Sequence, residues 1–129
     1  LADGCSATYI CSRHLDWRTY AAVEHCAISL TLGEKQVLFA ADADGSQENR
    51  EAFCALGNLT AMFVTPLFFA HPDGRHLLEA VRPETTVLYH IPFTQDDVTS
   101  LRPMAERELQ GTNSFQLKAL TEPDQTVFF

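Results

Sequence analysis

Apolar positions along the chain fall into short runs that alternate with turn residues and with segments of helical spacing. Residues 26–32 alternate large apolar with small or polar side chains, the period-two pattern of a strand with one buried face. The continuous apolar run 36–41 comes after a turn that begins at Gly33, so the two segments predict a hairpin. Further strands are predicted over residues 7–12, 60–66, 85–90, 115–120 and 126–129.

Two helices are predicted between these strands. Ser46 is a suitable N-cap for the first, which is expected to end near residue 56 because Gly57 comes next. Asp73 is the expected cap of a second, short helix that ends before Pro83.

A third helical segment is less regular. Thr94-Gln95-Asp96-Asp97 resembles a helix start, with acidic residues at the positive end of the dipole. Pro103 is expected to interrupt this helix, which predicts a turn and then a helix to about Gln110. The order β, ββ, α, β, α, β, α, β, β is an α/β alternation without a repeat or linker, so we expect residues 1–129 to form a single domain.

Composition narrows the classes of partner. The 129 residues are 46% hydrophobic and 20% charged, which is typical of a globular protein. Asp and Glu number 17 against 9 Lys and Arg, giving a net charge of −8, and this field repels both phosphate backbones and anionic membranes. We therefore expect no nucleic-acid partner and no membrane partner, and no apolar run approaches the roughly 20 residues that span a bilayer.

Cysteine use points to a cellular compartment. Cys5, Cys11, Cys26 and Cys54 contain no C-x-x-C pair. The last three lie among apolar neighbours, which predicts buried free thiols in a reducing, cytoplasmic location. A Cys5–Cys11 bridge is the alternative that these residues leave open.

Three apolar runs each end in a side chain that can bind a metal: His14, Asp42 and His90. If the runs are neighbouring strands, their ends lie at one edge of the sheet, where α/β proteins place chemistry. One carboxylate and two imidazoles form a partial site for Zn²⁺, Mn²⁺ or Fe. His25 competes with His14 for its role, whereas His71 and His76 are expected to be surface or packing residues.

The hairpin and these strand ends resemble the C-terminal half of a metallo-β-lactamase-fold hydrolase. The most specific stretch is Glu24 to Asp44. In that family the hairpin ends in a Gly-Asp pair whose aspartate bridges two metal ions, and here Ala41 replaces the glycine while Asp42 matches the aspartate. Segment 77–92 resembles the last helix–strand unit of the family, which ends in a metal-binding histidine.

That resemblance implies a fold and a site. The fold would be half of an αββα sandwich, with one mixed sheet and helices on one face. The complete fold would hold two ions, Zn²⁺ or alternatively Mn²⁺ or Fe, with His14, Asp42 and His90 among the ligands. The His-x-His-x-Asp-His signature, which supplies most ligands in the first half of the family's fold, does not occur in this chain.

The resemblance implies two main functions. The first is the C-terminal portion of a metal-dependent hydrolase, inactive alone, which acts on a small-molecule ester, amide, thioester or phosphodiester once an N-terminal half completes it. The second is a stand-alone degenerate half-fold that serves as an interaction or assembly module. A third and weaker hypothesis, without the resemblance, is an unrelated small α/β domain that binds a ligand at its strand ends. Half a sandwich leaves one sheet face bare, so we expect self-association or contact with a missing N-terminal half.

Overall fold

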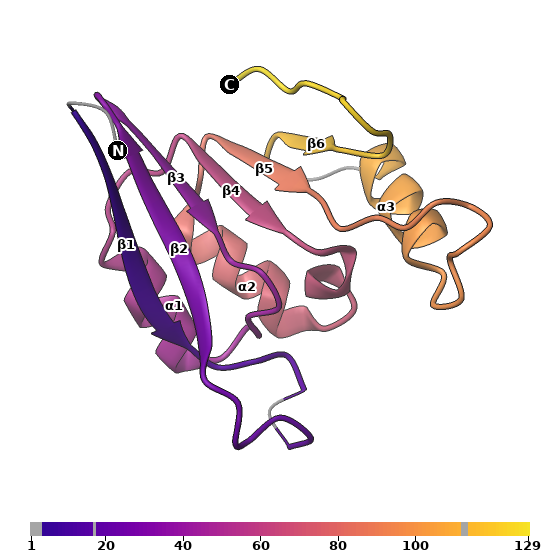
Figure 1. The fold of residues 1–129 in the computed structure, drawn as a ribbon, viewed down its shortest axis with the longest axis horizontal. Coiled ribbons are helices and arrows are strands. Elements are labelled where there is room, and N and C mark those ends of the chain that lie inside the picture. The colour runs from indigo at the N-terminus through magenta and orange to yellow at the C-terminus, as the bar shows by residue number, and fades with distance from the viewer. Residues whose placement is uncertain (1–3, 17, 112–113) are drawn as a thin grey trace.

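A mixed sheet in the order β1-β2-β3-β4-β5-β6, with helices packed on one face, forms the computed structural model (Figure 1). It describes residues 4–16, 18–111 and 114–129. The strands are Cys5–Ser12 (β1), His25–Leu32 (β2), Lys35–Phe39 (β3), Ala61–Val64 (β4), Thr85–Leu88 (β5) and Leu117–Ala119 (β6). The helices are Gln47–Cys54 (α1), Pro72–Val81 (α2) and Leu101–Gln110 (α3), with a 3-10 helix over Pro66–Phe69 (η1).

The sheet has an antiparallel end and a parallel end. Strands β1, β2 and β3 pair antiparallel, and β3, β4, β5 and β6 pair parallel. The predicted mixed sheet with helices on one face is confirmed. Among the residues that the structure describes, no helix combines the length and apolar character needed to cross a bilayer.

The main core lies between the sheet and the helices. Strand side chains alternate between the two faces, and one set points at the helices. Leu38, Met62 and Leu88 from the strands are fully buried there. The helical layer meets them with Phe53, Phe68, Phe69, Leu77, Leu78, Val81 and Ala105.

The opposite sheet face is covered in one part only. Val37, Phe63 and Val87 are buried there, because the C-terminal segment 120–129 lies over them. The Phe129 ring lies 6.1 Å from the Phe63 ring, and Lys35 Nζ donates to the Phe129 carbonyl oxygen at 2.6 Å. Over the β1–β2 hairpin, the described residues leave this face open, and Tyr9, Cys11 and Cys26 are exposed there.

Three local predictions are corrected by the structure. His71, rather than Asp73, caps α2: its Nδ1 accepts the Asp73 N–H. Pro103 does not interrupt α3, because it stands in the first turn, where a backbone N–H has no intrahelical partner in any case. Residues 126–129 form no strand: Gln125 Oε1 accepts the N–H groups of Thr121 and Glu122, which closes a turn before the segment crosses the face of the sheet.

The prediction of buried thiols is also wrong. All four cysteines are free, but Cys11, Cys26 and Cys54 are exposed and Cys5 is half-buried. Cys11 and Cys26 lie on the open face of the hairpin, where apolar neighbours in sequence do not produce burial. A Cys5–Cys11 bridge is excluded because six residues of one strand separate the two by about 20 Å.

Candidate functional site

The loops after β1 and β3 meet at one edge of the sheet. His14 forms an isolated antiparallel bridge with Ala43. The Leu15 N–H donates to the Asp42 carbonyl at 2.6 Å, and the Asp44 N–H donates to the Arg13 carbonyl at 3.0 Å. This pairing brings His14 and Asp42 together, with 4.0 Å between Nε2 and Oδ2. Two of the three predicted ligands are therefore neighbours.

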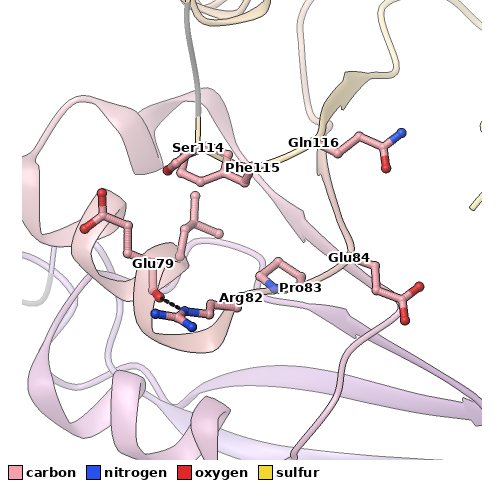
Figure 2. A pocket seen from close by; sticks show the side chains of 8 residues that line it. Glu79, Arg82, Pro83, Glu84, Ser114, Phe115 and Gln116 are labelled. Carbon is pink, nitrogen blue, oxygen red and sulfur yellow. Dashed lines mark hydrogen bonds between the residues drawn. The ribbon is translucent and has the colours of Figure 1, made fainter.

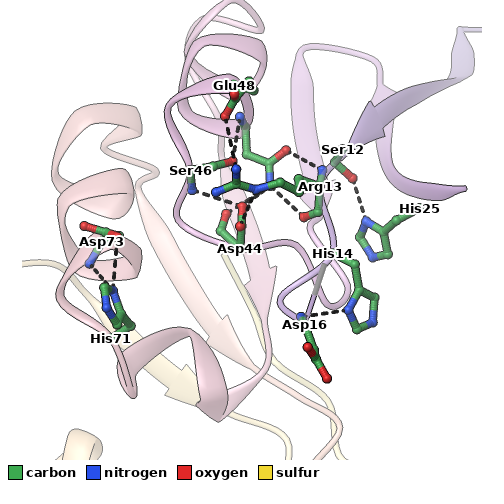
Figure 3. Close-up of polar contacts among 11 residues, drawn as sticks. Ser12, Arg13, His14, Asp16, His25, Asp44, Ser46, Glu48, His71 and Asp73 are labelled. Atoms are coloured by element: carbon green, nitrogen blue, oxygen red, sulfur yellow. Dashed lines mark hydrogen bonds and ion pairs between the residues drawn. The ribbon is translucent and has the colours of Figure 1, made fainter. Parts of the chain in front are cut away.

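Asn49, buried at the first turn of α1, holds this junction in place through Arg13 and Asp44, which Figure 3 labels. Its Oδ1 accepts the Arg13 N–H at 2.8 Å, and its Nδ2 donates to the Arg13 carbonyl at 2.9 Å and to Asp44 Oδ1 at 2.9 Å. The Arg13 guanidinium closes the network on Asp44, with Nε to Oδ2 at 2.6 Å. The network anchors the chain that carries His14 against the loop that carries Asp42.

The hydrogen bonds of His14 select a tautomer. Its Nδ1 accepts the Asp16 backbone N–H at 2.9 Å, so a neutral ring carries its proton on Nε2, the nitrogen that faces Asp42. The ring also lies against Tyr20, with 4.7 Å between centroids. In a histidine that binds a metal, the ring nitrogen that does not contact the metal normally donates its proton to an acceptor. The Nδ1 of His14 instead accepts a hydrogen bond.

His25 joins this group from the neighbouring strand. Its ring lies 5.3 Å from the His14 ring, and its Nδ1 lies 2.7 Å from Ser12 Oγ, the residue opposite it in the β1–β2 register. Burial and the nearby His14 lower the pKa of His25 below 6.5, and Asp42 and Asp44 oppose that shift. Sequence reasoning treated His14 and His25 as competitors, but the structure places both at the same edge.

His90 lies apart from this group. The two strand ends that carry Asp42 and His90 are separated by β4, which corresponds to about 10 Å across the sheet. His90 is exposed and lines a hollow of about 380 Å³ with Ile91, Asp96 and Leu101.

Tyr89 is the β5-end residue that approaches Asp42. Burial raises the pKa of its hydroxyl, the Asp42 carboxylate raises it further, and a hydrogen bond from the Ala41 N–H opposes both. Its ring packs edge-on against Phe39 and Phe63. The sequence did not indicate a role for Tyr89 because a tyrosine at the end of an apolar run is expected to be a core residue.

Ala41 supports the comparison with a Gly-Asp pair. Its φ is 50°, in the left-handed region where glycine is preferred. The backbone turn that places Asp42 therefore has the conformation that a glycine would adopt without strain.

The donors present do not make a complete metal site. Within residues 4–16, 18–111 and 114–129, no group of three or more His, Cys, Asp or Glu side chains is arranged to hold an ion. Zinc sites use three or four protein ligands, and the tautomer of His14 presents a proton, rather than a lone pair, toward Asp42. The predicted trio is therefore not assembled by this chain.

Another hollow lies at the opposite edge of the sheet. It measures about 580 Å³ and lies between the C-terminal end of α2 and residues 114–116 (Figure 2). Glu79, Arg82 and Glu84 line it, and Arg82 Nε donates to the Glu79 carbonyl. This hollow is separate from the strand ends at which His14 and Asp42 meet.

Comparison with known proteins supports the fold. No protein-family model matches the sequence, and no curated protein sequence matches it. The structure is that of an α/β half-sandwich, and it is similar to the metallo-beta-lactamase fold protein YhfI from Bacillus subtilis, with a TM-score of 0.54 and 13% sequence identity. The match covers 94% of this chain and 48% of YhfI, so the chain spans about half the length of that protein.

Proposed function

We propose that this chain, folded as a single domain, is the C-terminal portion of a metal-dependent hydrolase of the metallo-β-lactamase-like superfamily. The observation that carries the proposal is the extent of the structural match, which uses nearly all of this chain and about half of the similar protein. Alone, the chain is inactive, because its site is incomplete.

The strand ends support a shared site rather than a complete one. His14 and Asp42 lie at the edge of the sheet that would face a second half, and Asn49 fixes the backbone between them. The remaining donors would come from an N-terminal half that carries the His-x-His-x-Asp-His signature. In such a site, a metal would activate water near neutral pH.

The reading frame upstream of Leu1 tests this proposal first. A His-x-His-x-Asp-His stretch within it, together with zinc-dependent hydrolysis of a p-nitrophenyl ester or bis-p-nitrophenyl phosphate by the longer chain, would support the proposal. Asp42→Ala should then lower kcat/KM by at least about 100-fold. Asp73→Asn, at an exposed carboxylate on α2, is the matched control and should leave hydrolysis unchanged. Absence of the motif would refute the proposal.

One observation favours the interaction module as a second function. Tyr9 is 72% exposed and Leu32 is 47% exposed on the open face of the edge hairpin. An apolar face of this kind favours burial against a second copy of the chain. Size-exclusion chromatography with light scattering should then show a dimer that Tyr9→Ser weakens, and a monomer at all concentrations would argue against it.

A further inference from the structure

Cys11 and Cys26 stand directly opposite each other on the β1–β2 hairpin. The Gly33 N–H donates to the Gly4 carbonyl at 3.1 Å, which marks the pair Gly4/Gly33 as a hydrogen-bonded pair of this ladder. Pair types alternate along an antiparallel ladder, and Cys11/Cys26 lies an odd number of positions away in an unbroken register. The cysteines therefore form a non-hydrogen-bonded pair, the type in which side chains lie closest.

That geometry is compatible with a disulfide. Non-hydrogen-bonded pairs have Cα atoms about 4.5 Å apart, at the short end of the range that a disulfide spans. Both residues are exposed, so a soluble disulfide can reach them. Neither cysteine is a ligand of the proposed metal site.

We propose that Cys11 and Cys26 are a reversible redox pair, which a low-molecular-weight disulfide converts into a cross-strand disulfide. In the first step, the Cys11 thiolate attacks one sulfur of the reagent R–S–S–R, forming a mixed disulfide and releasing one thiolate RS⁻. In the second step, the Cys26 thiolate attacks the Cys11 sulfur and releases the second RS⁻. The protein loses two electrons and two protons, and the reagent becomes two RSH.

Cys26 takes the resolving role. Partial desolvation, the neighbouring Cys11 and the hydrogen bond between the thiols raise the pKa of Cys26. A raised pKa lowers the fraction of Cys26 that is present as thiolate, and this slows its attack on an external disulfide. Within the mixed disulfide, its position opposite Cys11 makes the second step intramolecular.

The bond would act at the junction described above. Cys11 precedes Ser12, which contacts His25, and Cys26 comes directly after His25. A covalent link at this pair would therefore hold together the strand ends that carry both histidines. The proposal does not depend on the proposed hydrolase function, because it concerns the hairpin alone.

Oxidation by glutathione disulfide tests the pair in the full chain. The variant Cys5→Ser/Cys54→Ser retains only the two opposed thiols. It should lose both free thiols, gain no glutathione, and show the mass of a chain lacking two hydrogens, all reversed by dithiothreitol. Peptide mapping should join Cys11 to Cys26.

Two further variants separate the steps. In the same background, Cys26→Ser should stop at a stable glutathione adduct on Cys11, whereas Cys11→Ser should form its adduct on Cys26 more slowly; circular dichroism should confirm that both are folded. The proposal would be overturned if the chain with both thiols kept its glutathione adduct, joined to a second chain, or retained two free thiols at an excess of glutathione disulfide.

Discussion

The parallel centre of the sheet and its antiparallel hairpin differ in how completely they are covered. Every residue of β4 and β5 is buried, because helices cover one face and the C-terminal segment covers the other. Most residues of β1 are exposed. The chain thus builds a complete core under its centre and leaves the hairpin half-covered. The junction that holds His14 and Asp42 lies where these two regions meet.

The largest contrast should come from matched leucines in the two regions. Leu38→Ala in β3 removes a fully buried side chain and should lower the free energy of unfolding by about 3 kcal/mol. Leu32→Ala in β2 removes a side chain that is half-exposed and should lower the free energy of unfolding by less than about 1 kcal/mol. Urea denaturation of both variants measures the difference. Equal losses would mean that the hairpin face is covered.

The junction itself depends on Asn49. Asn49→Ala removes three buried or part-buried hydrogen bonds, the one that Oδ1 accepts from the Arg13 N–H and those that Nδ2 donates to the Arg13 carbonyl and to Asp44 Oδ1, so we expect a loss of about 2 kcal/mol. Gln47→Ala, on the same helix, removes only an exposed bond to Glu51 and should change stability by less than about 0.5 kcal/mol. Chemical denaturation compares the two, and an Asn49 variant as stable as the Gln47 variant would show that the network does not anchor the junction.

Relief of backbone strain should give a smaller effect of opposite sign. Ala41→Gly removes the cost of a left-handed alanine and should stabilise the fold by about 0.5 to 1 kcal/mol after the extra entropy of glycine is counted. Ala70→Gly, at a right-handed position with φ −68°, should instead destabilise by a similar amount. Thermal unfolding of both proteins reports the sign, and a destabilised Ala41→Gly variant would contradict the strain.

The smallest effect should be the pH dependence of His25. Its folded pKa is lowered, so the neutral ring is favoured in the folded protein. The contribution of this shift to the free energy of unfolding is complete above pH 6.5, and it is lost as the pH falls through the lowered pKa of folded His25. Between about pH 7.5 and about pH 5, the native chain should therefore lose more stability than His25→Gln. His76→Gln, at an exposed position on α2, is the control, and identical losses in the native and His25→Gln chains would rule out the effect.

Sequence patterns predicted the architecture well because local rules govern it. The alternation over 26–32 and the turn at Gly33 predicted the β2–β3 hairpin, and Ser46 was identified as the cap of α1, where its Oγ accepts the Asn49 N–H. The prediction that Pro103 interrupts α3 was wrong because proline is tolerated in the first turn of a helix, whereas it breaks or kinks the helix interior.

The site was less predictable because it depends on long-range register. The pairing of Ser12 with His25 brings the two histidines together, and no local pattern shows that pairing. Likewise, Tyr89 rather than His90 approaches Asp42, because neighbouring residues at a strand end point in different directions. Spacing along the chain identifies candidate ligands but not which of them meet.

Calorimetric titration of Zn²⁺ into the purified chain tests the central claim, that this half-fold supplies only part of a metal site. We expect no stoichiometric site tighter than about 10 µM, and the same weak response from Asp42→Ala. One or more zinc ions bound at sub-micromolar affinity in the native chain, and lost in Asp42→Ala, would contradict it.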